Sequence, residues 1–420
     1  AYAELGPIIH TMRETRQPAI VVFEVERLSS HTNADEHTIY RSSKELESIQ
    51  QADPIKILAE HLTKQDIAAA ALDRLEAVLK CRLEKLAETA LNEPPPVPIF
   101  SAKKPLPGFL QAKAEEFNGN GEKQLNLREA ICGVLRQQLA DPSVQLFGED
   151  IEDPKGDVFG VTRGLSKDFP EQVKNSPLAE ATIVGSGIGR SLAGQKSVVF
   201  LQFADFLPLA FNQIASELGS MYWRTNGQWQ APVIIMIACG AYRPGLGPFH
   251  AQSGESICAH TPGIDVMMPT TAGDAAGLLN AAFQSGRPTL FFYPKSCLNS
   301  PEFSTSDDLA KHIVPIGKAR FIRQGNDITI VAYGSVLPLC IEVAEQLEQA
   351  AFGVDLIDLR CVSPWDKASV IASVAKTNRL LVVHEDNHSV SLSSEILASM
   401  AEHFDQAVKM ARVTRADTHI

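Results

Sequence analysis

The sequence lacks the features that would suit a membrane, a nucleic acid or a disulfide scaffold. Its longest apolar runs, such as PVIIMIAC at residues 232–239, fall far short of the roughly 20 residues that span a bilayer. Positive charge is in deficit, with 38 Lys and Arg against 50 Asp and Glu, so the net charge is −12. An acidic chain does not provide the basic field that nucleic acid or an anionic membrane surface requires. We therefore expect neither partner.

The seven cysteines have no CxxC spacing, and several catalytic signatures are missing as well. This cysteine pattern fits buried free thiols in a reducing compartment better than disulfides or a zinc site. There is no Walker loop and no GxSxG elbow, so P-loop chemistry and serine hydrolysis have little support. The glycine-rich GSGIGR at residues 185–190 is not GxGxxG, and we interpret it as a helix packed closely on a sheet rather than a dinucleotide site.

The first 91 residues are predicted to be mostly helical. A helix is expected first, then a buried strand, AIVVFEV, at residues 19–25. Ser42 and Glu45 form a capping-box pattern that predicts a helix start. A long amphipathic helix is expected from about residue 67 to 90, with a core-facing row of leucines. These leucines are Leu72, Leu75, Leu79, Leu83 and Leu86.

The remainder of the chain is predicted to be α/β. Residues 92–124 read as a linker, because residues 92–108 hold six prolines. Apolar strands then alternate with helices, which is typical of parallel sheets covered on both faces. The eight predicted strands are SVQLFGE, KSVVFLQF, APVIIMIA, GIDVMM, PTLFFY, DITIVAY, VDLIDL and RLLVVHE. A composition break at residues 300–312 separates a unit at 125–300 from one at 313–420.

Three residues attract attention on chemical grounds, and each also has an ordinary structural interpretation. His250, in a loop after APVIIMIA, could titrate near a ligand or simply occupy a structural loop. His31 reads more readily as a solvated loop histidine. Glu180 precedes a helix, where the helix dipole favours a negative charge. Spacing alone thus predicts a soluble multidomain α/β protein that is an enzyme.

From residue 127 to 420 the chain resembles the β subunit of the decarboxylating component of 2-oxo acid dehydrogenase complexes. The motifs that carry the resemblance, in order, are LREAI, FGED, DVFGVTRGLSKDFP, NSPLAEATIVGSGIGRSLAG, LQFADF, FNQIASELG, HAQSGES, HTPGIDVMMPTTAGDAAGLL, VAYGS, LIDLRCVSPWD and VAKTNRLLVVHED. Residues 1–91 resemble the C-terminal end of the α subunit through RLSSHTNADE, YRS and DPIKIL. The resemblance implies a fused α–β chain. Its fold would be a transketolase-like pyrimidine-binding domain followed by a smaller transketolase C-terminal-type domain.

The resemblance also implies thiamine diphosphate and Mg²⁺ as cofactors. Glu180 would be the carboxylate on the pyrimidine nitrogen, and Glu149 would lie nearby in an acidic relay. Three further residues would contact the pyrimidine, namely Phe206 by stacking and Leu178 and Gln202 by lining it. His250 and His31 would serve catalysis near the substrate, and Arg27 would bind the diphosphate. These roles are carried over from the family and are expectations.

The activity implied is oxidative decarboxylation of a 2-oxo acid, with acyl transfer to the lipoyl group of an acyltransferase partner. QFADF, HTPGID and PTLFFYPK favour branched-chain (2-oxoisovalerate) dehydrogenases over pyruvate or acetoin enzymes. A transketolase-like or synthase relative and a non-catalytic assembly module would fit the same motifs less well. A homodimer is expected, in a bacterial cytoplasm or a mitochondrial matrix.

Some family features are absent. No GDG with a downstream Asn occurs, although this motif holds the metal and diphosphate in the α subunit. Together with the first residue, Ala, and the ending TRADTHI, this predicts part of a longer protein, inactive by itself and with its Mg²⁺ ligands elsewhere. Met236 and Ala238 stand where relatives usually carry Arg and Pro. Ser285 and Arg287 stand at a potassium site of relatives, and we hypothesise that the guanidinium replaces the ion's charge.

Overall fold

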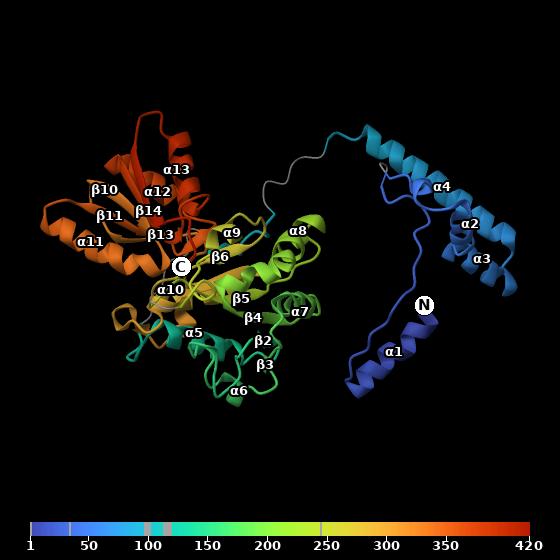
Figure 1. The fold of residues 1–420 in the computed structure, drawn as a ribbon, viewed down its shortest axis with the longest axis horizontal. Helices are drawn as coiled ribbons and strands as arrows, with labels where there is room; N and C mark the ends of the chain where they lie inside the picture. The colour runs from blue at the N-terminus through green and yellow to red at the C-terminus, as the bar shows by residue number, and fades with distance from the viewer. Residues whose placement is uncertain (1, 33–34, 96–101, 112–119, 244–245) are drawn as a thin grey trace. The chain divides into compact units, whose positions relative to one another are not determined.

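The structure is a computed structural model that describes residues 2–32, 35–95, 102–111, 120–243 and 246–420. The chain divides into two compact units, residues 1–98 and residues 99–420. Figure 1 shows helices alone in the first unit, and sheets with covering helices in the second. The α/β fold class predicted from the sequence is confirmed.

The first unit consists of helices and loops. Its elements are α1 (Tyr2–Thr15), η1 (His37–Ile39), α2 (Ser43–Gln51), α3 (Pro54–Lys64) and α4 (Ala69–Asn92). The predicted capping box is present at the start of α2, where the Ser42 side chain accepts from the Glu45 amide and Glu45 reaches back to the Ser42 amide. Asp53 caps α3 in a similar way, by accepting from the Ile55 amide.

Two expectations for this unit are wrong. Residues 19–25 form no strand, and Ile20 there is 93 % exposed. An extended β-branched run becomes a strand only beside another strand that takes up its backbone hydrogen bonds. The described part of residues 1–98 offers no such neighbour. The long helix predicted near residues 67–90 exists as α4, but Leu75, Leu79, Leu83 and Leu86 are exposed and no residue of α4 is buried.

The second unit is built around a seven-stranded sheet of order β12-β6-β7-β5-β4-β2-β3. All neighbouring strands are parallel except β12, which runs antiparallel to β6. The strands are β2 (Val144–Gly148), β3 (Val173–Asn175), β4 (Lys196–Phe203), β5 (Ile234–Cys239), β6 (Asp265–Met267), β7 (Thr289–Pro294) and β12 (Cys361–Ser363). The five strands predicted from the sequence in this region are confirmed.

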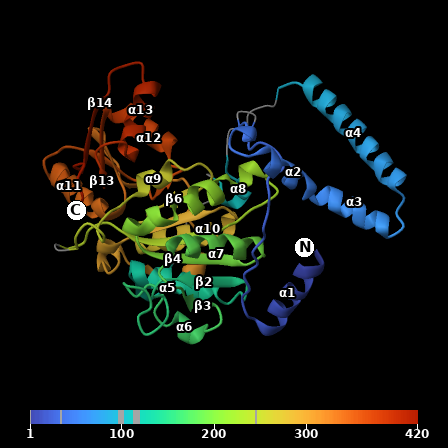
Figure 2. The same ribbon diagram turned by 45° about the vertical axis from the view of Figure 1, so that its right-hand side comes forward.

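Helices cover both faces of this sheet, which explains its continuous apolar strands (Figures 1 and 2). Along β4, Val198 and Phe200 point into the cluster formed with α5 and α10, whereas Val199 and Leu201 point into the cluster formed with α7 and α8. Strand β5 alternates in the same way. A strand buried on both faces has no polar side, as the sequence indicates. The helices of this region are α5 (Leu127–Gln138), α6 (Leu165–Asp168), α7 (Glu180–Leu192), α8 (Gly219–Arg224), α9 (Glu255–Ala259) and α10 (Ala272–Ser285).

A second sheet, of order β14-β13-β10-β11-β9, follows in the chain and shares a core with the first. Its strands are β9 (Arg320–Arg323), β10 (Ile328–Ala332), β11 (Val354–Asp358), β13 (Arg379–Asn387) and β14 (Lys409–Arg415), with α11 (Leu337–Gln349), α12 (Lys367–Thr377) and α13 (Leu392–His403). The predicted β10, β11 and β13 are confirmed. Val331 and Ile357 pack in the same buried cluster as Val199 and Ile235 of the first sheet.

Short elements complete the second unit. They are β1 (Gln124–Leu125) and β8 (Thr305–Ser306), which pair antiparallel, and the turns of helix η2 (Gly108–Leu110), η3 (Ala204–Ala210), η4 (Gln213–Leu218), η5 (Lys295–Cys297), η6 (Pro301–Phe303), η7 (Leu309–Lys311) and η8 (Gly334–Val336). Residues 102–111, in the region expected to be a linker, contact the unit directly. Leu110 is fully buried in its core, and Lys103 Nζ lies 3.1 Å from Asp265 Oδ1.

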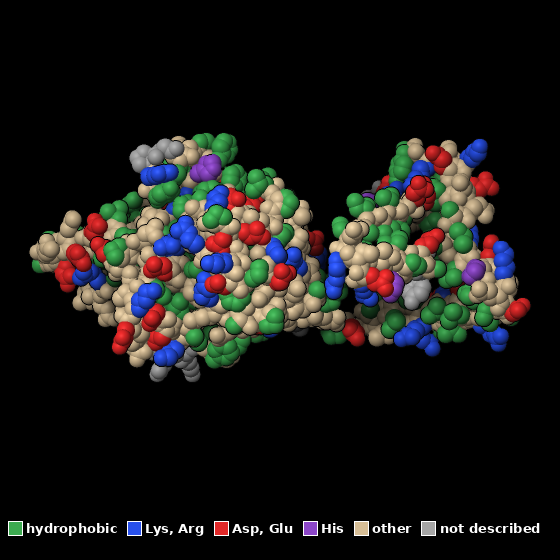
Figure 3. Space-filling model, turned by 90° about the horizontal axis from the view of Figure 1, so that it is seen from below, with side chains coloured by type: hydrophobic (Ala, Val, Ile, Leu, Met, Phe, Trp, Pro, Cys, Tyr) green, Lys and Arg blue, Asp and Glu red, His purple; other side chains and the backbone are tan. Residues whose placement is uncertain are grey.

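The surface and the thiols agree with the composition. All seven cysteines are free, as predicted, but the expectation that they are buried is wrong for Cys81, which is exposed, and for Cys132, which is half-buried. On the face of residues 99–420 that Figure 3 shows, blue and red side chains are interspersed. No helix in the described ranges combines the length and the apolar character that a bilayer span requires.

Close packing of α7 on β4 depends on Gly187. A Cβ added there would lie 2.7 Å from Val199 Cγ1 and 3.3 Å from Val233 Cγ1, whereas one added at Gly189 of the same helix would meet no atom within 4 Å. This is the role we predicted for GSGIGR.

We predict that Gly187→Ala lowers the free energy of unfolding by about 1–3 kcal/mol, because the new methyl group overpacks the helix–sheet contact. Gly189→Ala is the matched control and should raise the free energy of unfolding by up to about 1 kcal/mol, because alanine is the better helix former. Denaturant unfolding of both variants measures the difference. Equal effects at the two positions would contradict the packing argument.

Candidate functional site

Polar and charged residues gather where four parallel strands of the larger sheet end. Glu149 follows β2, Gln202 is the penultimate residue of β4, the loop after β5 carries His250, and Lys295 follows β7. Because the carboxyl ends of parallel strands lie at one edge, these residues meet there. This edge is where open α/β sheets bind ligands.

The carboxylates of Glu149 and Glu180 are close enough to influence each other. Glu180 is the first residue of α7, and Glu149 is 2 % exposed. The pKa of Glu149 is raised from 4.5 to about 7, mainly by burial and then by the negative charge of Glu180, while a hydrogen bond from the backbone amide of Gln202 partly offsets both. Two nearby carboxyl groups with one raised pKa are typical of sites that hold and move a proton.

An aromatic cluster lies around Phe203, the residue that follows Gln202. The His250 ring contacts the Phe203 ring edge-on, with centroids 4.7 Å apart, and the Phe206 ring with centroids 6.0 Å apart. Phe159 packs edge-on against both Phe203 and Tyr242. His250 is exposed, whereas Phe206 is half-buried. The cluster therefore offers an apolar wall with one imidazole at its rim.

A buried lysine, Lys295, contacts both the aromatic cluster and the backbone of His250. Lys295 is 5 % exposed, and its ammonium donates a hydrogen bond to the backbone carbonyl of His250. The same Nζ lies 5.1 Å from the centroid of Phe203 and 5.9 Å from that of Tyr242. Burial lowers the pKa of Lys295, although nearby groups including Asp205 and Glu385 partly restore it.

The structure thus brings Glu149, Glu180, Gln202, Phe206 and His250 to one region. Gln202 Nε2 donates to Asp150, the residue that follows Glu149. Leu178 is 76 % exposed in the turn before α7.

Arg27 and His31 belong to the helical unit and meet at Asp35. The Asp35 carboxylate accepts from the His31 amide at 2.6 Å and forms an ion pair with Arg27 at 3.4 Å. Arg27 also donates to the Tyr40 hydroxyl. Hydrogen bonds, first from the His31 amide and then from Tyr40, lower the pKa of Asp35.

Metal-type ligands do not cluster in the described residues, where no group of three or more His, Cys, Asp or Glu could hold an ion. At the expected potassium position, the Arg287 guanidinium lies 2.5 Å from the buried carboxylate of Asp265, and the Ser285 hydroxyl accepts from the Arg287 amide. This ion pair between Arg287 and Asp265 is compatible with our hypothesis that the guanidinium replaces the charge of a potassium ion.

Sequence reasoning missed Lys295 and the ring cluster around it. The signal was present for Lys295, since it directly follows the predicted strand PTLFFY and its proline. A charged residue at the carboxyl end of a buried parallel strand falls at the ligand-binding edge. Tyr242 and Phe159 gave no such signal, because their loops come together only in the fold.

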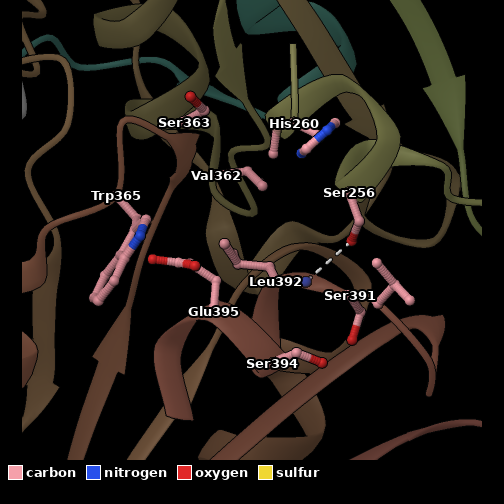
Figure 4. A pocket seen from close by; sticks show the side chains of 11 residues that line it. Ser256, His260, Val362, Ser363, Trp365, Ser391, Leu392, Ser394 and Glu395 are labelled. Carbon is pink, nitrogen blue, oxygen red and sulfur yellow. Dashed lines mark hydrogen bonds between the residues drawn. The ribbon is translucent and has the colours of Figure 1, made fainter. Parts of the chain in front are cut away.

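A separate cavity of about 530 Å³ lies between α9, the end of β12 and the start of α13 (Figure 4). Figure 4 shows Ser256 and Leu392 on facing segments, joined by a hydrogen bond from the Leu392 amide to the Ser256 hydroxyl at 3.2 Å. None of the site residues expected from the sequence lines it.

Three protein families match consecutive parts of the chain. Residues 8–98 match "Dehydrogenase E1 component", residues 123–301 match "Transketolase, pyrimidine binding domain", and residues 317–420 match "Transketolase, C-terminal domain". The order agrees with the fused arrangement predicted from the motifs.

Curated relatives match the β-type part at substantial identity. The "2-oxoisovalerate dehydrogenase subunit beta" of Bacillus subtilis (strain 168) is 38 % identical over 293 residues, which is 69 % of this chain and 88 % of that protein. The "Pyruvate dehydrogenase E1 component subunit beta" of Mycoplasma pneumoniae is 38 % identical over 298 residues, covering 70 % and 90 % of the two chains. A mitochondrial 2-oxoisovalerate dehydrogenase subunit beta 2 of Arabidopsis thaliana is 35 % identical over 298 residues, covering 70 % and 82 %.

A solved structure shares the fold. A "Split gene transketolase, inactive beta4 tetramer" superposes with a TM-score of 0.58 at 20 % identity, covering 70 % of this chain and 90 % of that one. This match supports the transketolase-like arrangement of the two sheets.

We predict that Glu149→Gln changes the pH dependence of stability. A carboxyl whose pKa is higher in the folded than in the unfolded protein costs stability as pH rises from about 4.5 to about 7, because the folded state must then release a proton that it holds more tightly. The free energy of unfolding of the variant minus that of the wild type should therefore be larger at about pH 8 than at about pH 5.

Glu180→Gln should narrow the pH range over which the wild-type protein loses stability, because it removes the negative charge that helps to raise the pKa of Glu149. Denaturant unfolding at the two pH values measures both effects, with the exposed Glu171→Gln as the control. Parallel pH profiles for wild type and Glu149→Gln would contradict the assignment.

Proposed function

Because the chain belongs to the family of thiamine diphosphate-dependent E1 components of 2-oxo acid dehydrogenase complexes, we propose that it decarboxylates a 2-oxo acid oxidatively. We propose further that branched-chain substrates are favoured and that the acyl group passes to the lipoyl arm of an acyltransferase partner. E1 components work with such an acyltransferase within their complexes.

The observation that carries the proposal is the carboxylate pair at the edge of the sheet. Glu149 Oε1 is buried without a hydrogen-bond partner among the described residues. No hydrogen bond to the Glu180 carboxylate occurs within the described ranges either, although Glu180 is half-buried. Unpaired carboxylate oxygens beside aromatic rings fit a heteroaromatic cofactor that presents both a ring face and hydrogen-bonding nitrogens.

When bound, thiamine diphosphate supplies a nucleophilic carbon and a sink for the electrons left by CO₂. Glu180 would hold a proton at the pyrimidine nitrogen, and Glu149 would keep a second proton available, since its pKa of about 7 lies close to neutral pH. Phe206 would stack on the pyrimidine ring, while Gln202 and Leu178 would border it.

His250 would meet the substrate carboxylate and the incoming lipoyl group. The rings of Phe159, Phe203 and Tyr242 line its surroundings with apolar surface. Apolar walls favour a substrate with a larger aliphatic side chain, by about 1–3 kcal/mol for each methylene that is buried. This supports branched-chain 2-oxo acids over pyruvate.

The helical unit would contribute Arg27 as a diphosphate ligand and His31 near the reacting carbon. Asp35 holds both through the contacts described above, so it would orient them. We propose that Mg²⁺ is bound by an α-type domain acting with this chain, and that two β-type parts pair in a dimer.

The first test is the rate of 2-oxo acid decarboxylation by Glu180→Gln in the full-length protein. We expect kcat to fall by about 10²–10⁴-fold, because the amide cannot take up the proton. Glu171→Gln, an exposed carboxylate near β3, is the control and should leave the rate unchanged. Near-normal turnover by Glu180→Gln would overturn the assigned role.

The second test compares substrates and acceptors for the wild-type protein. We expect kcat/KM for 3-methyl-2-oxobutanoate to exceed that for pyruvate by about tenfold or more, with free lipoamide as the acyl acceptor. A preference for pyruvate would contradict the branched-chain assignment. Transfer to an aldehyde instead of lipoamide would favour a transketolase-like activity.

A further inference from the structure

Side chains from separate parts of the second unit bind the backbone near both ends of the loop that follows β5. The described residues of this loop are 240–243 and 246–252, and they include His250. The loop closes at its base, where the Gly240 amide donates to the Gln252 carbonyl at 3.0 Å. Charged side chains outside the loop also bind described residues near its start and near its end.

Glu385 holds the start of the loop. It lies in β13 of the second sheet, and its Oε1 accepts a hydrogen bond from the Ala241 amide at 2.6 Å. Its other oxygen accepts from the Ser335 hydroxyl, which fixes the carboxylate from behind.

Gly240 shows how closely the loop approaches this carboxylate. The residue has a φ of +77°, and a Cβ added to it would lie 2.5 Å from Glu385 Oε2. The positive φ favours glycine, and an added Cβ would force the Glu385 carboxylate to shift. The first residue of the loop therefore packs closely against Glu385 of the second sheet.

Two further groups hold the end of the loop. The Asp205 carboxylate accepts from the Ala251 and Gln252 amides at 3.3 Å, and the Lys295 ammonium donates to the His250 carbonyl. Both belong to the first sheet's surroundings, in η3 and η5. Among these contacts, the one with Glu385 ties the loop to the second sheet.

We infer that Glu385 is a positioning residue for the reaction: it fixes the start of the loop after β5, whose Gly240 amide binds the Gln252 carbonyl, so that the His250 ring faces Phe206. The inference rests on the proposed function, because His250 acts there on the substrate. The physical basis is that a hydrogen bond from an amide to a carboxylate is stronger than one between neutral groups. An active-site residue displaced by about 1 Å can cost a hundredfold in rate.

The test uses Glu385→Ala and Glu385→Gln in the full-length protein. Alanine removes the acceptor of the Ala241 amide, whereas glutamine keeps a carbonyl oxygen in its place. We expect Glu385→Ala to lower kcat/KM for the 2-oxo acid by about ten- to a hundredfold, and Glu385→Gln to restore most of that loss.

Asp417→Ala is the matched control. Asp417 also accepts from a backbone amide and a hydroxyl, both of Ser389, but it binds no residue of the 240–252 loop among those described. It should leave kcat/KM unchanged. Amide hydrogen exchange provides a second readout that does not depend on activity, and peptides covering residues 246–252 should exchange faster in Glu385→Ala than in wild type or Asp417→Ala.

Unchanged exchange in that loop, or an equal loss of rate in Asp417→Ala, would overturn the inference. A loss of rate together with a lowered melting temperature and faster exchange throughout β13 would also overturn it, because the effect would then be general destabilisation. If the wild-type protein shows no 2-oxo acid activity, the proposed function fails. Faster loop exchange in Glu385→Ala would even then show that Glu385 fixes the loop, so the two failures can be told apart.

Discussion

The central strands of the larger sheet bury apolar side chains on both faces, and this constraint determines where chemistry can occur. In β4 and β5, successive residues alternate between two separate cores, so the middle of each strand carries apolar side chains only. Polar side chains can be accommodated only where the strands end. Glu149, Gln202 and Lys295 each lie at such an end. The site is thus a consequence of how the sheet is packed, as much as of its individual residues.

The sequence predicted the buried framework well and the exposed parts poorly. All eight proposed strands occur, because continuous runs such as KSVVFLQF can only be satisfied between two helical layers. Among the missed strands, β9 and β14, RFIR and KMARVTR, mix charged with apolar residues and lie at sheet edges. The strand expected at residues 19–25 and the core-facing leucines of α4 failed for the same reason: a pattern shows what a segment could bury, but not whether a neighbour is present in the unit.

The candidate site divides along a similar line. Residues in recognisable motifs, Glu149 in FGED and Gln202 and Phe206 in LQFADF, lie where their strands end and could be chosen from the sequence. Glu385 also lies in a motif, VAKTNRLLVVHED, but its contact with Ala241 could not be predicted, since it spans 144 positions in the sequence and forms only in the folded protein. Lys295 could be predicted only in part. Its position after a buried strand was visible, but a lysine held by two rings and a carbonyl is identified only from the packing.

Strand β12 has a bearing on how such a protein can be recombined. Residues 361–363 belong by sequence to the second α/β region, yet they pair with β6 and form the outer strand of the first sheet. The Met268 amide also donates to the Arg360 carbonyl, just before that strand. A chimera that joins the first sheet of one relative to the second sheet of another at residues 300–312 would therefore receive a foreign edge strand in its first sheet. The natural unit of exchange includes both sheets, and a shorter exchange must graft residues 360–363 with the recipient's first sheet.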